Sequence, residues 1–376
     1  MMNKWTVALA ATGVVGLASA VLAEESHPVN TLLPATTLSG YVDTSAIWNF
    51  GKGGAQANRF VNTGGTGSIG GNRQDGFNLN VVKLQLEKPL DEGTWSAGYK
   101  AELWAGPDAV GLPGSAGIGS NLAIKQAYVA LRAPVGNGID IKIGQFDPII
   151  GYEVADSYAN PNFSRSFGFA YEPLGHTGVL ATYQFTEVFG IAAGVANTYA
   201  GPINAKVATE ARKTFMSGIT IKAPESLGFL AGSSLYAGVI DGGNDKVKDT
   251  INLYSGASIA TPIKALSLGV AYDYVANLTA NGSYANAYAV YASYQITEKL
   301  KGNLRGEYAN NSGGVLYGAN DEKITGLTAT IDYSLWANVV TRAEFRWDHI
   351  AGGSVVAPFN GQKNDLSVAV NVIYKF

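Results

Sequence analysis

The chain has 376 residues, no cysteine and a formal net charge of −3. The lack of cysteine excludes a disulfide framework and thiolate chemistry, and the slightly acidic balance argues against a nucleic-acid partner. Charged residues make up only 15% of the chain, whereas it contains 47 glycines and 20 tyrosines. Because no apolar run beyond the N-terminal one could form a transmembrane helix, this composition favours an exported all-β protein.

The N-terminus has the layout of a secretory signal peptide. Lys4 supplies the positive charge, an apolar alanine-rich run follows it, and cleavage is expected between Ala20 and Ala23. A transmembrane anchor is the alternative, but the run is short and no stop-transfer flank follows it. The expected organisation is a signal peptide over residues 1–23, a short linker over residues 24–37 and a β-barrel over residues 38–376.

The mature part of the chain consists of segments in which apolar and polar residues alternate. Tyr99 and Leu103, for example, fall on one face of their segment, and Lys100 and Glu102 fall on the other. This alternation is typical of a β-strand with one apolar and one wet face. About 16 such segments of roughly 10 residues are each long enough to cross a bilayer when tilted. The predicted strands are 38–50, 78–87, 94–104, 123–132, 139–146, 177–186, 189–198, 213–223, 229–240, 250–260, 265–276, 285–296, 300–309, 324–334, 338–348 and 365–376.

The connections between these segments alternate in length. The short ones are 88–93, 133–138, 186–189, 223–228, 261–265, 297–300 and 334–338, and the long ones are 51–76, 105–122, 147–176, 199–212, 241–249, 277–284, 310–323 and 349–363. A soluble β-sandwich or β-propeller has no reason to sort its loops in this way. The pattern predicts an all-β fold, a transmembrane antiparallel β-barrel with short periplasmic turns and long external loops.

The polar face of the strands should look into the lumen, and it carries both signs of charge in equal number. The basic residues of this face are Lys83, Lys100, Arg132, Lys142, Lys222, Lys301, Arg305, Arg342 and Arg346; the acidic ones are Asp43, Glu87, Glu102, Asp140, Asp273, Glu307, Asp332, Glu344 and Asp348. Charges at membrane depth need water or an opposite charge, and side chains cannot fill so wide a barrel. We expect a water-filled channel; a plugged interior with paired charges is the alternative.

The third long loop, residues 147–176, is longer than a plain connector and rich in aromatic residues. Such a loop should pack on something, and the inside of a wide barrel is available. In general porins the third external loop folds inward and forms the constriction. By analogy, we expect acidic residues of this loop to face basic residues of the wall across a narrow water path. The predicted constriction residues are Asp147, Glu153, Asp156 and Arg165 of the loop and Lys100, Arg132, Lys142, Arg305, Arg342 and Arg346 of the wall. An external cap or a subunit contact is the alternative.

The last strand ends the chain. Val370, Val372, Tyr374 and Phe376 share its apolar face, and the two aromatic residues would lie at the membrane interface. The ending resembles the C-terminal signal by which bacterial outer-membrane proteins are recognised for assembly. The resemblance implies outer-membrane lipid and the assembly machinery as partners.

A family resemblance rests mainly on the third long loop and the strand after it. The motifs are Gly151-Tyr152-Glu153-Val154-Ala155-Asp156-Ser157, Asn160-Pro161-Asn162-Phe163-Ser164-Arg165-Ser166-Phe167 and His176-Thr177-Gly178-Val179-Leu180-Ala181-Thr182-Tyr183, with Gly40-Tyr41-Val42-Asp43 at the first strand. They resemble the putative beta-barrel porin-2, or OmpL-like, family. Leu180 departs from the more polar residue expected there. The resemblance implies a porin-like barrel in the bacterial outer membrane, and by analogy a homotrimer.

Signs of catalysis or cofactor binding are weak. Asp348 and His349 are adjacent and so face opposite sides of a strand, and His176 has only Thr177 beside it. The Asp241–Asp245 segment lacks the spaced carboxylates of a calcium loop. We therefore expect no enzyme, cofactor or metal site, and a porin for passive diffusion of small hydrophilic solutes and ions. The alternatives are a non-conducting structural or adhesive barrel and, less favoured, a rim-site hydrolase.

Overall fold

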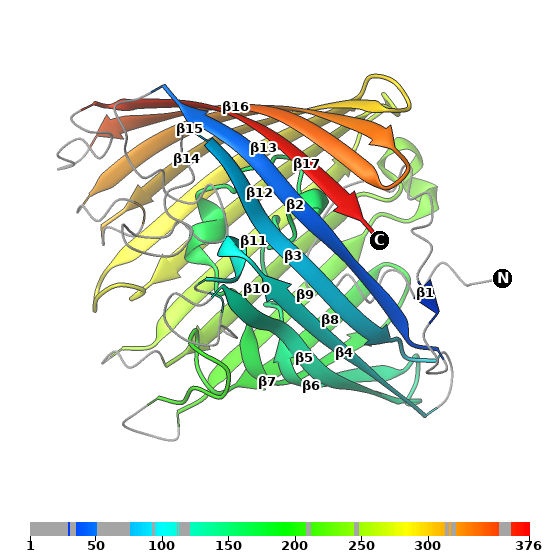
Figure 1. The fold of residues 1–376 in the computed structure, drawn as a ribbon. Helices are drawn as coiled ribbons and strands as arrows, with labels where there is room; N and C mark the ends of the chain where they lie inside the picture. Colours follow the sequence, from blue (N-terminus) through cyan, green and yellow to red (C-terminus); the bar gives the residue numbers. More distant parts are fainter. Residues whose placement is uncertain are drawn as a thin grey trace.

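The computed structural model describes residues 29–30, 35–50, 76–91, 95–110, 112, 121–207, 212–243, 248–312, 316, 321–352 and 362–376. Within these residues, sixteen antiparallel strands, β2 to β17, form a closed barrel (Figure 1). Each strand pairs with its neighbours in the sequence, and β17 pairs with β2 to close the sheet. The predicted barrel of about 16 strands is confirmed. The predicted signal peptide lies outside the described residues.

The strands follow the alternating segments of the sequence closely. Their bounds are β2 Thr37–Asn49, β3 Gly76–Lys88, β4 Ser96–Ala105, β5 Leu122–Ala133, β6 Ile139–Phe146, β7 His176–Gln184, β8 Phe189–Ala196, β9 Thr214–Lys222, β10 Ser234–Gly242, β11 Thr250–Ala260, β12 Leu266–Ala276, β13 Tyr284–Gln295, β14 Leu300–Asn311, β15 Glu322–Trp336, β16 Val339–Gly352 and β17 Asn364–Lys375. The helical elements of the described residues are four short 3-10 turns: η1 Pro107–Ala109, η2 Ser157–Ala159, η3 Gly168–Tyr171 and η4 Glu225–Leu230. In the part of the chain that is described, no helix is long and apolar enough to cross a membrane.

One predicted strand is misplaced. The alternation predicts a strand over residues 229–240, whereas β10 begins only at Ser234 because η4 occupies the preceding residues. Gly228 and Gly232 have positive φ angles of 61° and 83°, which glycine adopts readily and which turn the chain before the strand. The apolar residues Leu227 and Phe229 belong to this exposed turn, so their hydrophobicity does not mark a strand.

The barrel has an apolar outer surface and a polar interior. Val370, Val372 and Tyr374 of β17 are exposed, while Asn371 between them is buried. The same alternation runs through the other strands, as expected for a sheet with lipid on one side and water on the other. Exposed tryptophans stand near strand ends, and Trp48 packs edge-to-face on Phe77 at 6.4 Å between ring centres. Aromatic residues at these heights suit the two membrane interfaces.

The closing seam of the barrel uses the end of the chain. The Phe376 amide donates to the Gly40 carbonyl at 3.0 Å, and the Gly40 amide donates to the Phe376 carbonyl at 2.9 Å. A Cβ atom on Gly40 would lie 2.1 Å from the Lys83 carbonyl oxygen and 2.7 Å from the Phe376 ring, so only glycine fits. A two-residue strand, β1 (Val29–Asn30), adds to the start of β2 within the predicted linker.

Candidate functional site: the third external loop inside the lumen

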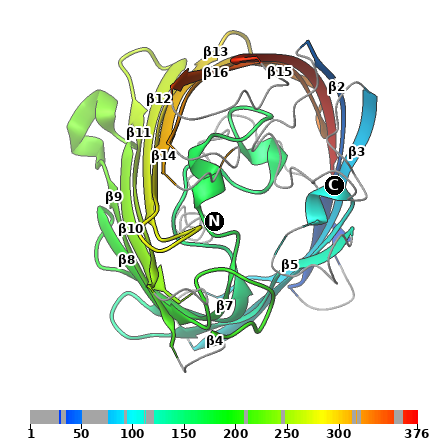
Figure 2. The same cartoon turned by 90° about the vertical axis from the view of Figure 1, so that its left-hand side faces the viewer.

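The loop between β6 and β7, residues 147–175 and here named L3, lies inside the barrel (Figure 2). Every residue of L3 is buried or half-buried, although it connects two strands at the external end. Its path includes the 3-10 turns η2 and η3. Phe167 and Tyr171 are fully buried. An aromatic-rich loop of this length is therefore packed against the barrel wall and not solvated.

The first part of L3 packs on an apolar stretch of the wall. Ile150 and Tyr152 belong to the same buried cluster as side chains of β7 to β14. The Tyr152 ring stacks on Tyr291 with 4.2 Å between ring centres. Two wall residues that face this part of the loop are glycines. A Cβ atom on Gly238 would lie 2.8 Å from Ile150 Cγ2, and one on Gly269 would lie 2.0 Å from the Tyr152 hydroxyl. The loop therefore approaches the wall too closely for a side chain at either position.

A larger residue at Gly238 is expected to push L3 off this wall. Gly238→Leu adds four carbons where the first would already touch Ile150, so we expect a loss of about 1–3 kcal/mol in the free energy of unfolding. Gly306→Leu is the matched control, because nothing lies within 4 Å of a Cβ atom there. Urea unfolding of both refolded variants measures the difference, and equal stability would contradict the close fit of L3.

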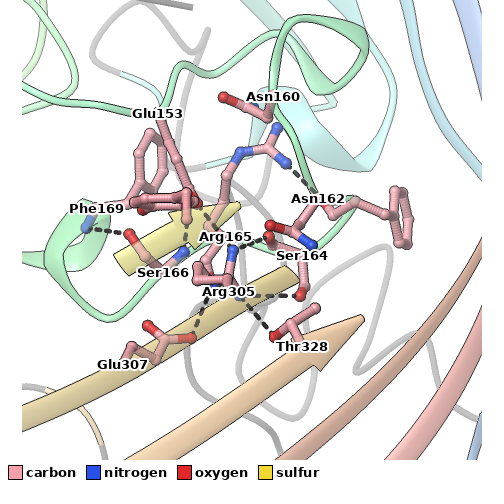
Figure 3. Close-up of polar contacts among 12 residues, drawn as sticks. Glu153, Asn160, Asn162, Ser164, Arg165, Ser166, Phe169, Arg305, Glu307 and Thr328 are labelled. Atoms are coloured by element: carbon pink, nitrogen blue, oxygen red, sulfur yellow. Dashed lines mark hydrogen bonds and ion pairs between the residues drawn. The ribbon is translucent and has the colours of Figure 1, made fainter. Parts of the chain in front are cut away.

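Arg305 on β14, the cross-strand partner of Tyr291, also joins L3 to the wall (Figure 3). Its guanidinium donates to the Glu153 carboxylate of L3 at 2.8 Å and to the Ser164 carbonyl at 2.7 Å. It also donates to Glu307 on its own strand at 2.9 Å and to the Thr328 hydroxyl at 3.1 Å. Arg305 is fully buried, so these contacts replace the water that the charge has lost.

Other wall side chains bind the backbone of L3. The Glu344 carboxylate accepts the amides of Phe163 at 2.6 Å and Ser164 at 2.9 Å. Arg346 donates to the Arg165 carbonyl at 2.6 Å, and Arg342 donates to the Ser157 and Asn160 carbonyls at 2.7 and 3.0 Å. Loop backbone away from water needs such partners. The wall supplies them from every second residue of β16, which places Arg342, Glu344 and Arg346 on its inner face.

A third set of contacts holds L3 to the strands across the seam. Lys83 on β3 pairs with Asp156 of L3 and with Glu102 on β4, each at 2.8 Å. The Tyr158 ring of L3 lies edge-on to Tyr41 at 5.0 Å between ring centres, and the Lys375 ammonium lies over the Tyr158 ring at 5.6 Å. L3 is thus fixed at several points around the lumen.

The predicted constriction residues separate into two groups. Glu153, Arg165, Arg305, Arg342 and Arg346 are at most 4% exposed. Glu153 and Arg305 of this group are in direct contact, and Arg165 donates to carbonyls of L3 itself, at 2.6 Å to Phe163. The remaining predicted residues, Lys100, Arg132, Lys142, Asp147 and Asp156, are half-buried. Their role in a constriction stays a prediction.

The half-buried group is also partly paired. Arg132 forms two hydrogen bonds of 2.6 Å with Asp140 on the neighbouring strand, and Asp147 pairs with Lys125. Lys142 lies over the Tyr128 ring, 5.0 Å from its centre. The charges that reach the water of the lumen are therefore fewer than the sequence suggests.

The alternation pattern does not predict the inward position of two wall residues, Lys125 and Asn80. Lys125 and Gln126 are adjacent on β5 and both buried, because the register with β4 shifts between Glu102 and Leu103. Asn80 is likewise buried beside a register shift in β3 and donates to Asp43 at 2.7 Å. A β-bulge turns an additional side chain inward. The signal in the sequence is a break in the alternation: two neighbouring polar residues at Lys125-Gln126, and two neighbouring apolar residues at Val81-Val82 after Asn80.

One loop carboxyl has an altered acidity. Burial raises the pKa of Glu172 well above its usual range, and the nearby Asp273 carboxyl adds to the rise. This environment favours the neutral form of Glu172 over the charged one.

The residues considered for catalysis have other partners. Asp348 accepts the Arg346 guanidinium at 2.9 Å, while His349 lies 2.8 Å from Asn364 and stacks on Trp347. His176 is buried, with its nearest polar partner a backbone carbonyl at 3.4 Å. No cluster of three metal-ligating residues occurs among the residues that the structure describes.

Fold and loop together define a class: a transmembrane β-barrel whose third external loop lies inside a polar lumen. A family model described as "Putative beta-barrel porin-2, OmpL-like" matches residues 35–376, and the chain belongs to this family. It is accordingly a porin-type channel of the bacterial outer membrane. A search of the curated proteins gave no match.

Solved structures share the fold at low sequence identity. The outer membrane channel DcaP of Acinetobacter baumannii has 15% identity and a TM-score of 0.57, with 91% of this chain and 97% of that chain covered. OmpF of Salmonella typhi, in complex with daunomycin, has 15% identity and a TM-score of 0.59, with the same coverage. The trimer form of in-vitro folded OmpT of Vibrio cholerae has 13% identity and a TM-score of 0.57, covering 91% and 99%. These similarities support the fold.

Proposed function

We propose that the protein lets small hydrophilic solutes and ions diffuse passively past L3. The observation that carries this proposal is the position of L3 inside a sixteen-stranded barrel, among described strands that turn polar faces inward. A barrel of this size is too wide for wall side chains alone to fill. Because L3 is fixed to the wall by direct ion pairs and hydrogen bonds, it narrows the lumen as a rigid body.

The same proposal includes the export of the chain, its assembly into the outer membrane and its oligomeric state. Residues 1–23 direct export, and the strand that ends in Tyr374 and Phe376 is recognised by the outer-membrane assembly machinery and embedded in lipid. A homotrimer is proposed because a structural neighbour is described in a trimer form. No catalytic role is proposed, because Asp348 accepts a hydrogen bond from Arg346 and the His349 ring is hydrogen-bonded to Asn364.

A liposome-swelling assay tests diffusion directly. Vesicles containing the refolded protein should swell in isotonic solutions of small sugars, and the rate should fall steeply as the sugar grows, because L3 limits the cross-section. Swelling no faster than in protein-free vesicles, with the heat-dependent gel shift of a folded barrel present, would favour the non-conducting structural barrel.

A further inference from the structure

Five lysines point into the lumen, three from the periplasmic ends of their strands and two, Lys100 and Lys142, from the middle. They are Lys100, Lys142, Lys222, Lys301 and Lys375, here named the lysine set. Lys222 is the last residue of β9, Lys375 is the last of β17 and Lys301 is the second of β14. All five are half-buried, so their ammonium groups reach water while their stems lie on the wall.

Within the described residues, Lys142, Lys222, Lys301 and Lys375 form no ion pair. Lys100 lies 3.9 Å from Glu102, which already has a 2.8 Å partner in Lys83. Lys100 and Lys142 flank the same ring: Lys100 is directly opposite Tyr128 across the strand pair, and the Lys142 ammonium lies over that ring. Two cations thus share one small area of the wall.

The carboxylates at the same depth are mostly neutralised. Asp140 is bound by Arg132, and Asp332 is bound by Arg342 at 3.0 Å. Glu102 and Asp156 share Lys83. Glu87 and Asp43 are the exceptions: Glu87 accepts a hydrogen bond from Gln85 at 2.8 Å, and Asp43 accepts from the side-chain amides of Asn80 and Asn371. Five lysines therefore face two carboxylates that lack a described cationic partner.

We infer that the lumen selects for small anions through the lysine set. This inference rests on the proposed diffusion channel and names its solute class. At physiological salt a charge on the wall acts over a screening length of about 8–10 Å. The positive potential of the lysine set therefore extends into the water path, so that anions are concentrated there and cations are depleted.

Reversal potentials in a planar lipid bilayer with a KCl gradient test this inference. The wild-type protein should show a chloride-to-potassium permeability ratio above one. The double variant Lys100→Glu/Lys142→Glu should lower that ratio at least about threefold, because two nearby cations become anions. Lys213→Glu is the matched control: it makes the same charge change at an exposed position at the external end of β9, and the ratio should stay at the wild-type value.

The outcomes separate the inference from the proposed function. No current at all would overturn the diffusion channel. Stable current with a ratio at or below one in the wild type, or with a ratio that the double variant leaves unchanged, would overturn anion selection and leave the channel standing. If the double variant fails to refold, the permeability ratio of Lys301→Glu tests the same inference at a lysine on a different strand.

Discussion

Replacing Arg305 by methionine is expected to cost about 3–5 kcal/mol of the free energy of unfolding. Methionine keeps much of the volume but removes the charge, so Glu153 and Glu307 lose a cationic partner while their side chains remain only 1% exposed. The Ser164 carbonyl loses a donor as well. L3 is then held mainly by its contacts with β16 and with Lys83.

Urea unfolding of the refolded protein, followed by tryptophan fluorescence and by the heat-dependent gel shift, measures this loss. Lys301→Met is the matched control, because Lys301 lies on the same lumen face of β14 and forms no ion pair within the described residues. It should change the stability by less than about 1 kcal/mol. Equal midpoints for the two variants would show that Arg305 does not hold L3.

Shortening L3 should produce the largest functional change. Residues 150–171 can be replaced by a short glycine-serine linker without separating the strands, because Phe146 and His176 are already direct partners across β6 and β7. The single-channel conductance should rise by roughly twofold or more, since L3 no longer reduces the water-filled cross-section. Arg305, Arg342 and Arg346 would then face water and keep their solvation.

The matched control places the same linker at residues 279–282, an exposed turn between β12 and β13. Its conductance should equal that of the wild type. A shortened L3 that leaves the conductance unchanged, in a protein with an intact heat-dependent gel shift, would contradict L3 as the narrow part of the channel.

The strands could be predicted from the sequence because their signal is local. Lipid on one side and water on the other force an alternation that can be read residue by residue, as in Val370 to Tyr374. The prediction fails where glycine turns the chain before β10 and where a bulge places Lys125 inward. Both depend on backbone geometry that hydrophobicity does not report.

The inward position of L3 was predicted by analogy, but its attachment was not. A count of nine basic and nine acidic residues on the inner face favours neither sign of ion. The structure pairs charges that are far apart in the sequence, such as Arg305 with Glu153 and Lys83 with Asp156. Pairing leaves the lysine set in contact with water, and no sequence pattern reports which charges are cancelled in this way.

Planar-bilayer recording on the purified, refolded protein is the most direct test of a water-filled lumen beside L3. The structure predicts discrete, stable conductance steps that persist without any ligand, because the barrel and its bound loop form one rigid open assembly. Protein that is inserted and shows the heat-dependent gel shift, yet gives no stable open state, would contradict a diffusion channel.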